Sequence, residues 1–442
     1  MQQTLSCGNV STKLRRIAEL AREHPERSFT AISHVIDVEF LKEAYRRTRK
    51  DAAAGVDGQS AEQYAAGLES NLGSLLDRFQ SGTYWAPPVK RVYIPKGEGA
   101  GLRPIGIPTF EDKVLQRAVA MVLEAIYEQD FLDCSYGFRP DKSAHQALEA
   151  LWKSLMDVNG GWVIEVDLKD FFGSLDHSQL RGFLDRRVKD GVIRRVIDKW
   201  LQAGVMEEGC VRHPETGSPQ GGVISPILSN VYLHEALDVW FERQVKPRLT
   251  GRADLIRYAD DYVLVFGQET DAKRVMETLP KRLGKYGLTL HPEKTRLLRF
   301  DRPGTKQDGT DGKGPASFDF LGFTHFWGRT RKGRWSVRQK TASSRLTRAV
   351  FKMRTWCRFN RHLPVAEQQQ ALNRKLRGHY SYYGITGNGD ALGGFFQEVR
   401  RIWRKWLDRR GKRGSMCWER FEQLLGRYPL LGPRVVHGLG HS

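Results

Sequence analysis

The segment 254–266 constrains the fold most strongly, because it places two adjacent acidic residues between two apolar runs. Residues 254–258 and 262–266 each have the length of a short β-strand, and Asp260 and Asp261 fall where the chain must reverse. Neighbouring carboxylates between apolar strands are costly unless a cation neutralises them. For the Asp-Asp pair alone, a solvated hairpin turn is the simpler interpretation. The interpretation as a cation-binding site requires further acidic residues nearby.

A second strand supplies such a residue. Residues 162–167 form a hydrophobic run that ends in Asp167 and is followed closely by Phe172. Three hard oxygen ligands from two strands suit Mg²⁺, which shares its coordination shell with substrate phosphates. With two Mg²⁺ ions, one activates the attacking hydroxyl and the other stabilises the leaving pyrophosphate. The three aspartates therefore predict an enzyme that catalyses nucleotidyl transfer.

The charge of the chain is uneven. Of the 71 Lys and Arg and the 51 Asp and Glu residues, 26 basic and only 6 acidic ones lie beyond residue 328, and this last quarter accounts for the whole net charge of +20. Lys and Arg neutralise phosphates and release condensed counterions. We therefore expect a polyanionic partner that binds mainly to the C-terminal region.

Composition excludes several classes of protein. Hydrophobic residues make up 40% of the 442 residues, enough to bury cores, and at roughly 100 to 200 residues per domain we expect two to four domains. No apolar run approaches the roughly 18 residues of a membrane-spanning helix, and residues 1–16 lack the core of a signal peptide. The five cysteines lie far apart, without a Cys-x-x-Cys pair, which disfavours a zinc cluster or a disulfide framework. We expect a soluble protein of a reducing cytoplasm that does not bind membranes.

Periodicity divides the chain into helical and mixed parts. Apolar residues at three- and four-residue spacing predict helices in residues 1–85, and the alternating runs 89–94 and 103–108 predict a basic β-hairpin. Strands and helices mix in residues 111–328, which indicates an α+β fold. The further expected elements are helices at 39–49, 61–79, 112–127, 143–156 and 223–243, a strand at 318–326, a loop at 302–316 and a helical part beyond about 340.

Several motifs occur in an order that resembles the bacterial group II intron-encoded reverse transcriptases and maturases. Residues 258–261, Tyr-Ala-Asp-Asp, resemble the signature turn of reverse transcriptases, and the strand that ends in Asp167 resembles their first palm motif. The resemblance covers nearly the whole chain, and it is specific as a set. The other matching segments are 55–58 (Gly-Val-Asp-Gly), 136–140 (Tyr-Gly-Phe-Arg-Pro), 217–226 (Gly-Ser-Pro-Gln-Gly-Gly-Val-Ile-Ser-Pro), 288–295 (Leu-Thr-Leu-His-Pro-Glu-Lys-Thr) and 433–437 (Pro-Arg-Val-Val-His).

The resemblance implies a right-hand polymerase of the α+β class, with fingers and a palm built on an antiparallel sheet, followed by an α-helical thumb. Residues 1–85 would form an N-terminal helical extension and the start of the fingers, 86–328 the fingers and palm, and 329–442 the basic thumb/maturase domain. Many relatives continue into an HNH endonuclease, whereas this sequence stops at Ser442 without a Cys and His cluster. The expectation is therefore the compact type that lacks this domain.

The resemblance also assigns roles around the aspartates. Asp167, Asp260 and Asp261 would be catalytic, and together with Leu168 they would hold the two Mg²⁺ ions. Phe172, five positions after the first aspartate, would pack under the sugar and leave no room for a 2′-hydroxyl. A plain core residue is the alternative interpretation of this phenylalanine.

Four further residues would bind the nucleotide. Lys96 and Arg103 in the basic hairpin resemble the residues that clamp the triphosphate, and Gln220 resembles the residue that lines the nucleotide pocket. Lys294 matches a lysine that is thought to donate a proton to pyrophosphate. Solvated surface positions for the two hairpin residues, and an ordinary loop before a helix for Gln220, are the alternatives.

Nucleic acid would be bound by basic residues of two regions. Arg139 would contact the template backbone, and residues 318–323 resemble the segment that grips the primer end, although apolar packing also explains its phenylalanines. Trp403 and Trp406 are expected in a helix core, with arginines on the outer face. The C-terminal candidates for binding nucleic acid are Arg374, Lys375, Arg377, Arg404 and Lys405.

The resulting hypothesis is an RNA-directed DNA polymerase that binds group II intron RNA, assists its splicing and copies it during retrohoming. Its partners would be the intron RNA, an RNA template with a DNA primer, target DNA and deoxynucleotides, and a homodimer is possible. A reverse transcriptase with a host role, or an RNA-binding splicing factor without polymerase activity, are the alternatives. Intact catalytic residues argue against the last of these, because a decayed site would have lost at least one.

Overall fold

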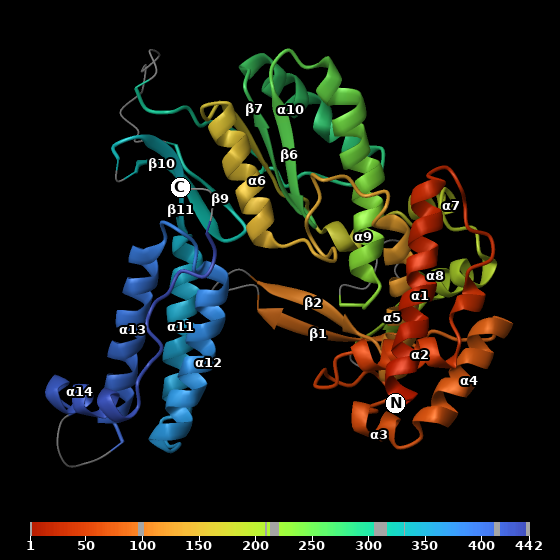
Figure 1. The fold of residues 1–442 in the computed structure, drawn as a ribbon, viewed down its shortest axis with the longest axis horizontal. Helices are drawn as coiled ribbons and strands as arrows, with labels where there is room; N and C mark the ends of the chain where they lie inside the picture. The colour runs from red at the N-terminus through yellow and green to blue at the C-terminus, as the bar shows by residue number, and fades with distance from the viewer. Residues whose placement is uncertain are drawn as a thin grey trace. The chain divides into compact units, whose positions relative to one another are not determined.

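The computed structural model describes residues 2–95, 101–207, 210–212, 221–304, 316–330, 332–410 and 416–438. Lys96, Gln220 and most of the predicted loop 302–316 lie outside these residues. The chain forms two compact units: the first contains residues 1–143 and 164–297, and the second contains residues 144–163 and 298–442. Helices and sheets are mixed in both, so the predicted α+β class is confirmed (Figure 1).

The N-terminal part of the first unit is helical, as predicted. The residue before the second helix, Asp37, accepts a hydrogen bond from the Phe40 amide, and Ser60 and Gln63 form a capping box at the third. One helix was expected over residues 61–79, but the structure has two, and Gly67 separates them because glycine is a poor helix former. The helices here are α1 (Gln2–Glu23), α2 (Val38–Arg47), α3 (Ala61–Ala65), α4 (Leu68–Ser81) and α5 (Phe110–Tyr127), with a 3-10 turn at Ser33–Val35.

The predicted basic hairpin is confirmed. Strands β1 (Val89–Pro95) and β2 (Leu102–Ile107) pair antiparallel, with Ile94 opposite Arg103. On the other side β1 pairs in parallel with β4 (Val205–Glu207), which pairs antiparallel with β5 (Cys210–Arg212). Two helices, α7 (His177–Asp185) and α8 (Gly191–Gln202), precede β4 in the chain.

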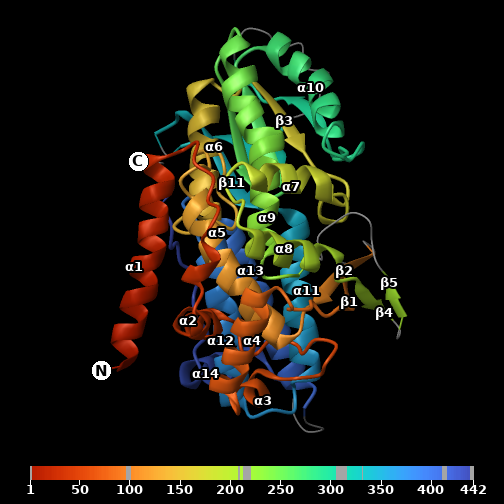
Figure 2. The same ribbon diagram turned by 90° about the vertical axis from the view of Figure 1, so that its right-hand side faces the viewer.

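The second sheet carries the predicted acidic residues. Its strand order is β6-β7-β3-β8, where β6 is Ala253–Tyr258, β7 is Asp261–Phe266, β3 is Trp162–Val166 and β8 is Arg296–Arg299. Helix α10 (Glu269–Gly284) lies beside this sheet and buries an apolar stripe that includes Val275 and Leu279 (Figure 2). The long helix expected at 223–243 is present as α9 (Ser225–Leu233), which continues in π-helical segments at His234–Asp238 and Phe241–Val245 and a 3-10 turn at Lys246–Arg248.

The second unit joins α6 to a three-stranded sheet and the C-terminal helices. The strand predicted over residues 318–326 is two strands, because Leu321 and Gly322 both have positive φ values and turn the chain. Trp152 of α6 donates to the Val337 carbonyl at 3.0 Å. The elements are α6 (Ala144–Asp157), β9 (Phe318–Phe320), β10 (Phe323–Arg329), β11 (Trp335–Thr341), α11 (Ser343–Phe359), α12 (Val365–Tyr383), α13 (Gly389–Asp408) and α14 (Trp418–Arg427).

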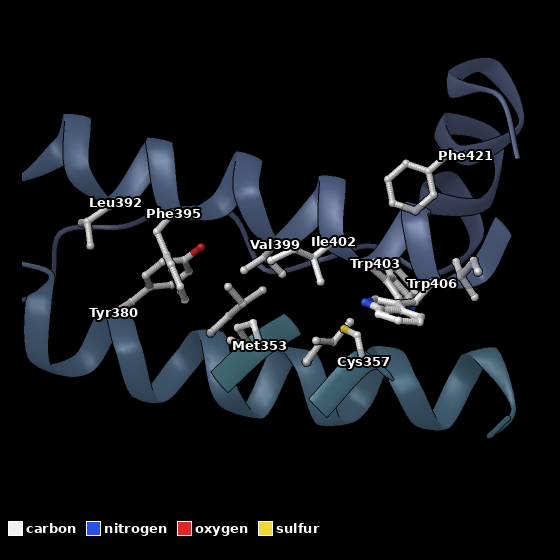
Figure 3. Close-up of a cluster of buried hydrophobic side chains, with 13 residues drawn as sticks. Met353, Cys357, Tyr380, Leu392, Phe395, Val399, Ile402, Trp403, Trp406 and Phe421 are labelled. Atoms are coloured by element: carbon white, nitrogen blue, oxygen red, sulfur yellow. The ribbon is translucent and has the colours of Figure 1, made fainter. Parts of the chain in front are cut away.

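A tryptophan-rich core joins the C-terminal helices. Trp403 is fully buried and Trp406 nearly so, as expected from their spacing, and Phe421 of α14 contacts Trp403 edge to face (Figure 3). Burying one such large side chain stabilises the fold by about 1.5 to 3 kcal/mol. The Trp403 indole also donates to Gln368 at 2.9 Å, which satisfies its polar group.

No helix in the part of the chain that the structure describes is both long and apolar enough to cross a membrane.

Candidate active site

The Asp260-Asp261 pair lies on a two-residue hairpin turn. Tyr258 pairs with Asp261, so Ala259 and Asp260 connect the strands. Ala259 has a φ of 57°, in the left-handed region that non-glycine residues seldom adopt. A turn with such a residue persists only when its surroundings hold it in place.

One support is the backbone of residues 134–137. The amide of Tyr136 donates to the Arg257 carbonyl, and the amide of Arg257 donates to the Cys134 carbonyl, each at 2.8 Å, so this segment runs alongside β6. A Cβ atom added to Gly137 would lie 2.3 Å from the Ala259 nitrogen. Only glycine allows this close approach of the two backbones, which explains the glycine in the Tyr-Gly-Phe-Arg-Pro motif.

The second support is the fully buried guanidinium of Arg257. It donates to the Ala259 carbonyl at 3.0 Å, and to both oxygens of the buried Asp238 at 2.7 and 2.5 Å. Its remaining donors reach Asn230 at 3.1 Å and Ser135 at 2.7 Å. A guanidinium offers five donors in a fixed geometry, so one residue ties the turn to the helical segments and the neighbouring loop.

Sequence reasoning missed Arg257 and Asp238 as functional candidates. A signal was available for the arginine, because strand alternation places it on the same inward face of β6 as the apolar Ala253 and Leu255. Nothing in the sequence indicates which of the many acidic residues pairs with it.

Asp167 follows β3 and is already neutralised by a cation. Its carboxylate pairs with the ammonium of Lys294 at 2.7 Å, and both side chains are partly exposed. The amide of His291 donates to the Asp167 carbonyl at 2.8 Å, which fixes the loop that carries Lys294. The structure therefore brings Lys294 to the candidate site.

Electrostatic effects connect the three groups around Asp260. Burial raises the pKa of its carboxyl, the charge of Asp167 raises this pKa further, and the guanidinium groups of Arg103 and Arg257 lower it. Asp260 is partly buried, whereas Asp261 and Arg103 are exposed. The positive charge of Arg103 on the basic hairpin thus acts on the acidic turn.

The donor set fits a magnesium ion in part. Three carboxylates are joined by the Leu168 carbonyl, which accepts no hydrogen bond from a described backbone amide, whereas the Asp167 carbonyl accepts one from the His291 amide. No group of three or more His, Cys, Asp or Glu side chains among the described residues is arranged to hold a metal by itself. Mg²⁺ usually takes one or two carboxylates and completes its shell with water and substrate phosphates, so the donors suit an ion that arrives with a nucleotide.

The two phenylalanines after Asp167 differ in burial. Phe171 is buried, and Phe172 is half-buried and contacts it edge to face at a centroid distance of 5.2 Å. The core position therefore belongs to Phe171. The role of Phe172 in rejecting ribonucleotides stays a prediction.

Residues 221–224 lie against two other elements. A Cβ on Gly221 would lie 2.6 Å from the Gly106 carbonyl of β2, and the Val223 amide donates to Gln116 of α5 at 2.7 Å. Gln116 donates in turn to the buried Asp112 at 2.9 Å, which also accepts from Tyr84 and Trp200. Burial raises the pKa of Asp112 to about 6. This network anchors the residues that directly follow Gln220.

Arg139 has an internal role in the structure. Its side chain is 5% exposed, pairs with Glu128 at 3.0 Å and donates to the Leu132 and Ser135 carbonyls at 2.9 and 2.8 Å. These contacts leave little of the guanidinium for a phosphate. The predicted template contact is untested, and it would have to compete with this network.

The C-terminal basic residues include both exposed side chains and one that is engaged within the protein. Arg374, Arg377 and Lys405 are exposed, as is Lys375, which lies 5.6 Å from the centre of the Trp356 ring. Arg404 is half-buried, donates to the Met416 carbonyl at 2.7 Å and stacks over Trp418 at 4.4 Å. Their contacts with nucleic acid stay predictions, and the geometry favours the exposed four.

Comparison with known proteins identifies the class. The family described as reverse transcriptase (RNA-dependent DNA polymerase) matches residues 94–325, more than half of the chain. The protein YkfC of Escherichia coli is 33% identical over 388 residues, which cover 78% of this chain and 97% of that protein.

Intron-encoded relatives narrow the assignment. The group II intron-encoded protein LtrA of Lactococcus lactis is 35% identical over 303 residues, which cover 65% of this chain and 50% of LtrA. The putative COX1/OXI3 intron 1 protein of Saccharomyces cerevisiae is 28% identical over 316 residues, 60% of this chain and 37% of its own length. The chain belongs to the reverse transcriptase family, as a group II intron reverse transcriptase/maturase, and it is an RNA-directed DNA polymerase.

Proposed function

We propose that the protein copies RNA into DNA by two-metal nucleotidyl transfer at Asp167, Asp260 and Asp261. The observation that carries the proposal is the convergence of three features on one turn. The turn is supported from inside by Arg257, and it is within electrostatic range both of Asp167 and of Arg103 on the basic hairpin.

The aspartates and the Leu168 carbonyl would hold two Mg²⁺ ions. When bound, these ions supply activation of the primer hydroxyl and stabilisation of the leaving pyrophosphate. The protein contributes orientation, because the hydrogen bond from Arg257 fixes the turn before substrate arrives.

The remaining residues would bind and select the nucleotide. Arg103, with Lys96, clamps the triphosphate, and Phe172 and Gln220 line the sugar and base pocket. Lys294 carries an exposed ammonium next to Asp167, from where it can donate a proton to the departing pyrophosphate.

The same chain would assist splicing of a group II intron and copy it during retrohoming. The basic hairpin and its sheet would serve as fingers, the sheet β6-β7-β3-β8 as palm, and helices α11 to α14 as thumb. The printed names of the relatives and the basic C-terminal region support this proposal, because structured RNA is bound mainly through shape and phosphate.

A primer-extension assay with Asp260→Asn tests the proposal. With Mg²⁺, deoxynucleotides and a DNA primer on an RNA template, the parent should extend the primer, and the variant should lose at least a hundredfold in rate while it still binds RNA. Extension by the variant at the parental rate would disprove the role of the turn. Loss of RNA binding together with extension would indicate a structural defect instead.

A further inference from the structure

A basic groove lies beside α10, away from the aspartates. It has a volume of about 410 Å³ and is formed by α10 and the π-helical extension of α9 with its following turn. None of its lining residues belongs to β3, to the Asp260 turn or to the basic hairpin. Its charged and aromatic residues are Trp240, Arg248, Arg274, Lys281, Arg282 and Lys285.

The groove concentrates positive charge. It is lined by five cations and by no Asp or Glu. Other cations on these elements are paired: Lys246 binds Glu242 at 3.0 Å, and Lys273 binds Glu269 at 2.7 Å. No ion pair links a groove cation to a carboxylate of the described residues. Like charges at such spacing oppose folding, so an anionic ligand would relieve an unfavourable arrangement.

Arg282 of the groove is held in place by hydrogen bonds. Arg282 donates to the Ala236 carbonyl at 2.9 Å and to the Glu235 carbonyl at 3.0 Å, both within the π-helical segment His234–Asp238. Its guanidinium lies 5.7 Å from the centre of the Trp240 ring. This preorganised wall, with an aromatic ring beside a fixed charge, needs little ordering when a ligand binds.

The spacing of the cations favours an extended anion. From Arg274 to Lys285 the helix rises roughly 16 Å at about 1.5 Å per residue, which exceeds the size of one phosphate group. Arg274, Lys281 and Lys285 are exposed and follow one another along this length. A run of phosphates along a nucleic-acid backbone matches such a row better than a single small anion does.

We propose that this groove is a second RNA-binding surface, which holds the phosphate backbone of structured RNA apart from the duplex that is being copied. The inference rests on the proposed function, because it names a surface that would bind the intron RNA. Only two uncharged polar side chains, Gln244 and Thr278, are among the lining residues, and the Thr278 hydroxyl donates to the Arg274 carbonyl at 2.9 Å. With cations in the majority, binding depends mainly on phosphate and shape.

A charge-neutralised variant tests the groove. Arg274→Gln/Lys281→Gln/Lys285→Gln removes three exposed cations, and the control Lys153→Gln/Lys189→Gln/Arg195→Gln removes three exposed cations outside α10. The readouts are the affinity for a folded group II intron RNA across salt concentrations, extension of a DNA primer on a short RNA template, and the melting temperature. All six residues lie outside the candidate active site.

The groove variant should bind the folded RNA about tenfold more weakly, and the slope of log affinity against log salt should fall by roughly 2 to 3, near one per lost phosphate contact. Its short-template extension should match that of the parent, and its melting temperature should be equal or higher, because like charges that oppose folding are removed. Parental affinity in the groove variant, or an equal loss in the control, would overturn the proposal. If the parent itself does not bind the folded RNA, the proposed function fails, which is a separate result.

Discussion

Arg257 is the residue on which the geometry of the acidic turn depends most. Its guanidinium is fully buried and connects the Ala259 carbonyl to Asp238, Asn230 and Ser135. A buried ion pair is weak evidence for stability, because desolvation offsets much of the attraction between the charges. The contribution of this ion pair is to orient the guanidinium, since the same group that neutralises Asp238 also donates a hydrogen bond to the turn.

Two variants, one without the Arg257 charge and one without both charges of the pair, distinguish the effect of Arg257 on protein stability from its effect on the position of the turn. Arg257→Met leaves Asp238 buried without its partner, so we expect a loss of about 3 to 5 kcal/mol in the free energy of unfolding. Adding Asp238→Leu should restore part of that loss, since apolar groups can replace a buried pair. Primer extension should stay about 10- to 100-fold below the parent in both variants, because the turn lacks its donor. Urea unfolding and extension rates measure the two effects, and recovery of both in the double variant would reduce Arg257 to a stabilising residue.

At the scale of elements, close backbone contacts decide where the turn lies. The segment 134–137 runs beside β6, and Gly137 touches the backbone of Ala259. Asp112 has a similar function elsewhere in this unit, where it joins α5 to α8 through Trp200 and, through Gln116, to Val223 just before α9. Both arrangements position candidate site residues by contacts between segments distant in sequence.

Gly137→Ala should impair activity more than stability. Its Cβ would meet backbone rather than a flexible side chain, at 2.3 Å from the Ala259 nitrogen, so the turn or the loop must shift. We expect at least a tenfold fall in primer extension. The control is Gly182→Ala in α7, where a Cβ has open space and should stabilise the helix by about 0.5 to 1 kcal/mol. Parental activity of Gly137→Ala would show that the turn tolerates displacement.

Asp112 should make stability depend on pH. Its pKa is raised by burial from 3.8 to about 6, so the folded protein holds the proton more tightly than the unfolded chain. The resulting stabilisation is complete below pH 4 and is lost as the pH rises through 6, and it amounts to roughly 3 kcal/mol. Asp112→Asn should abolish this component of the pH dependence. The test is the free energy of unfolding of both proteins at several pH values from 4 to 7, and parallel profiles would contradict the assignment.

At the scale of the molecule, the two units are not simple halves of the sequence. The second unit takes in residues 144–163 as well as 298–442. In it α6 contacts β11 through Trp152, and β10 pairs with β11 from Phe323 to Arg329. The predicted boundary at residue 328 falls inside β10.

A fragment of residues 329–442 should therefore fold poorly by itself. It lacks β10 and α6, so β11 would expose the edge and the face that these elements cover. We expect a broad thermal transition by circular dichroism, although the tryptophan-rich helices should keep helical content. A cooperative transition in the fragment would show that the helical core suffices.

Local patterns determined much of this protein. The hairpin with Asp260 on its turn, the basic hairpin 89–107, the α+β class and the buried tryptophans of α13 follow from alternation, helical spacing and apolar flanks. These properties depend on residues near one another in the chain.

The tertiary structure decided which charged residues are already engaged. It paired Arg257 with Asp238, placed Lys294 on Asp167, turned Arg139 inward, and left the cations of the groove without an ion pair to a carboxylate of the described residues. The physical reason is that ion pairs, burial and close backbone contacts join segments far apart in sequence, and local composition carries no record of which partner each charge finds.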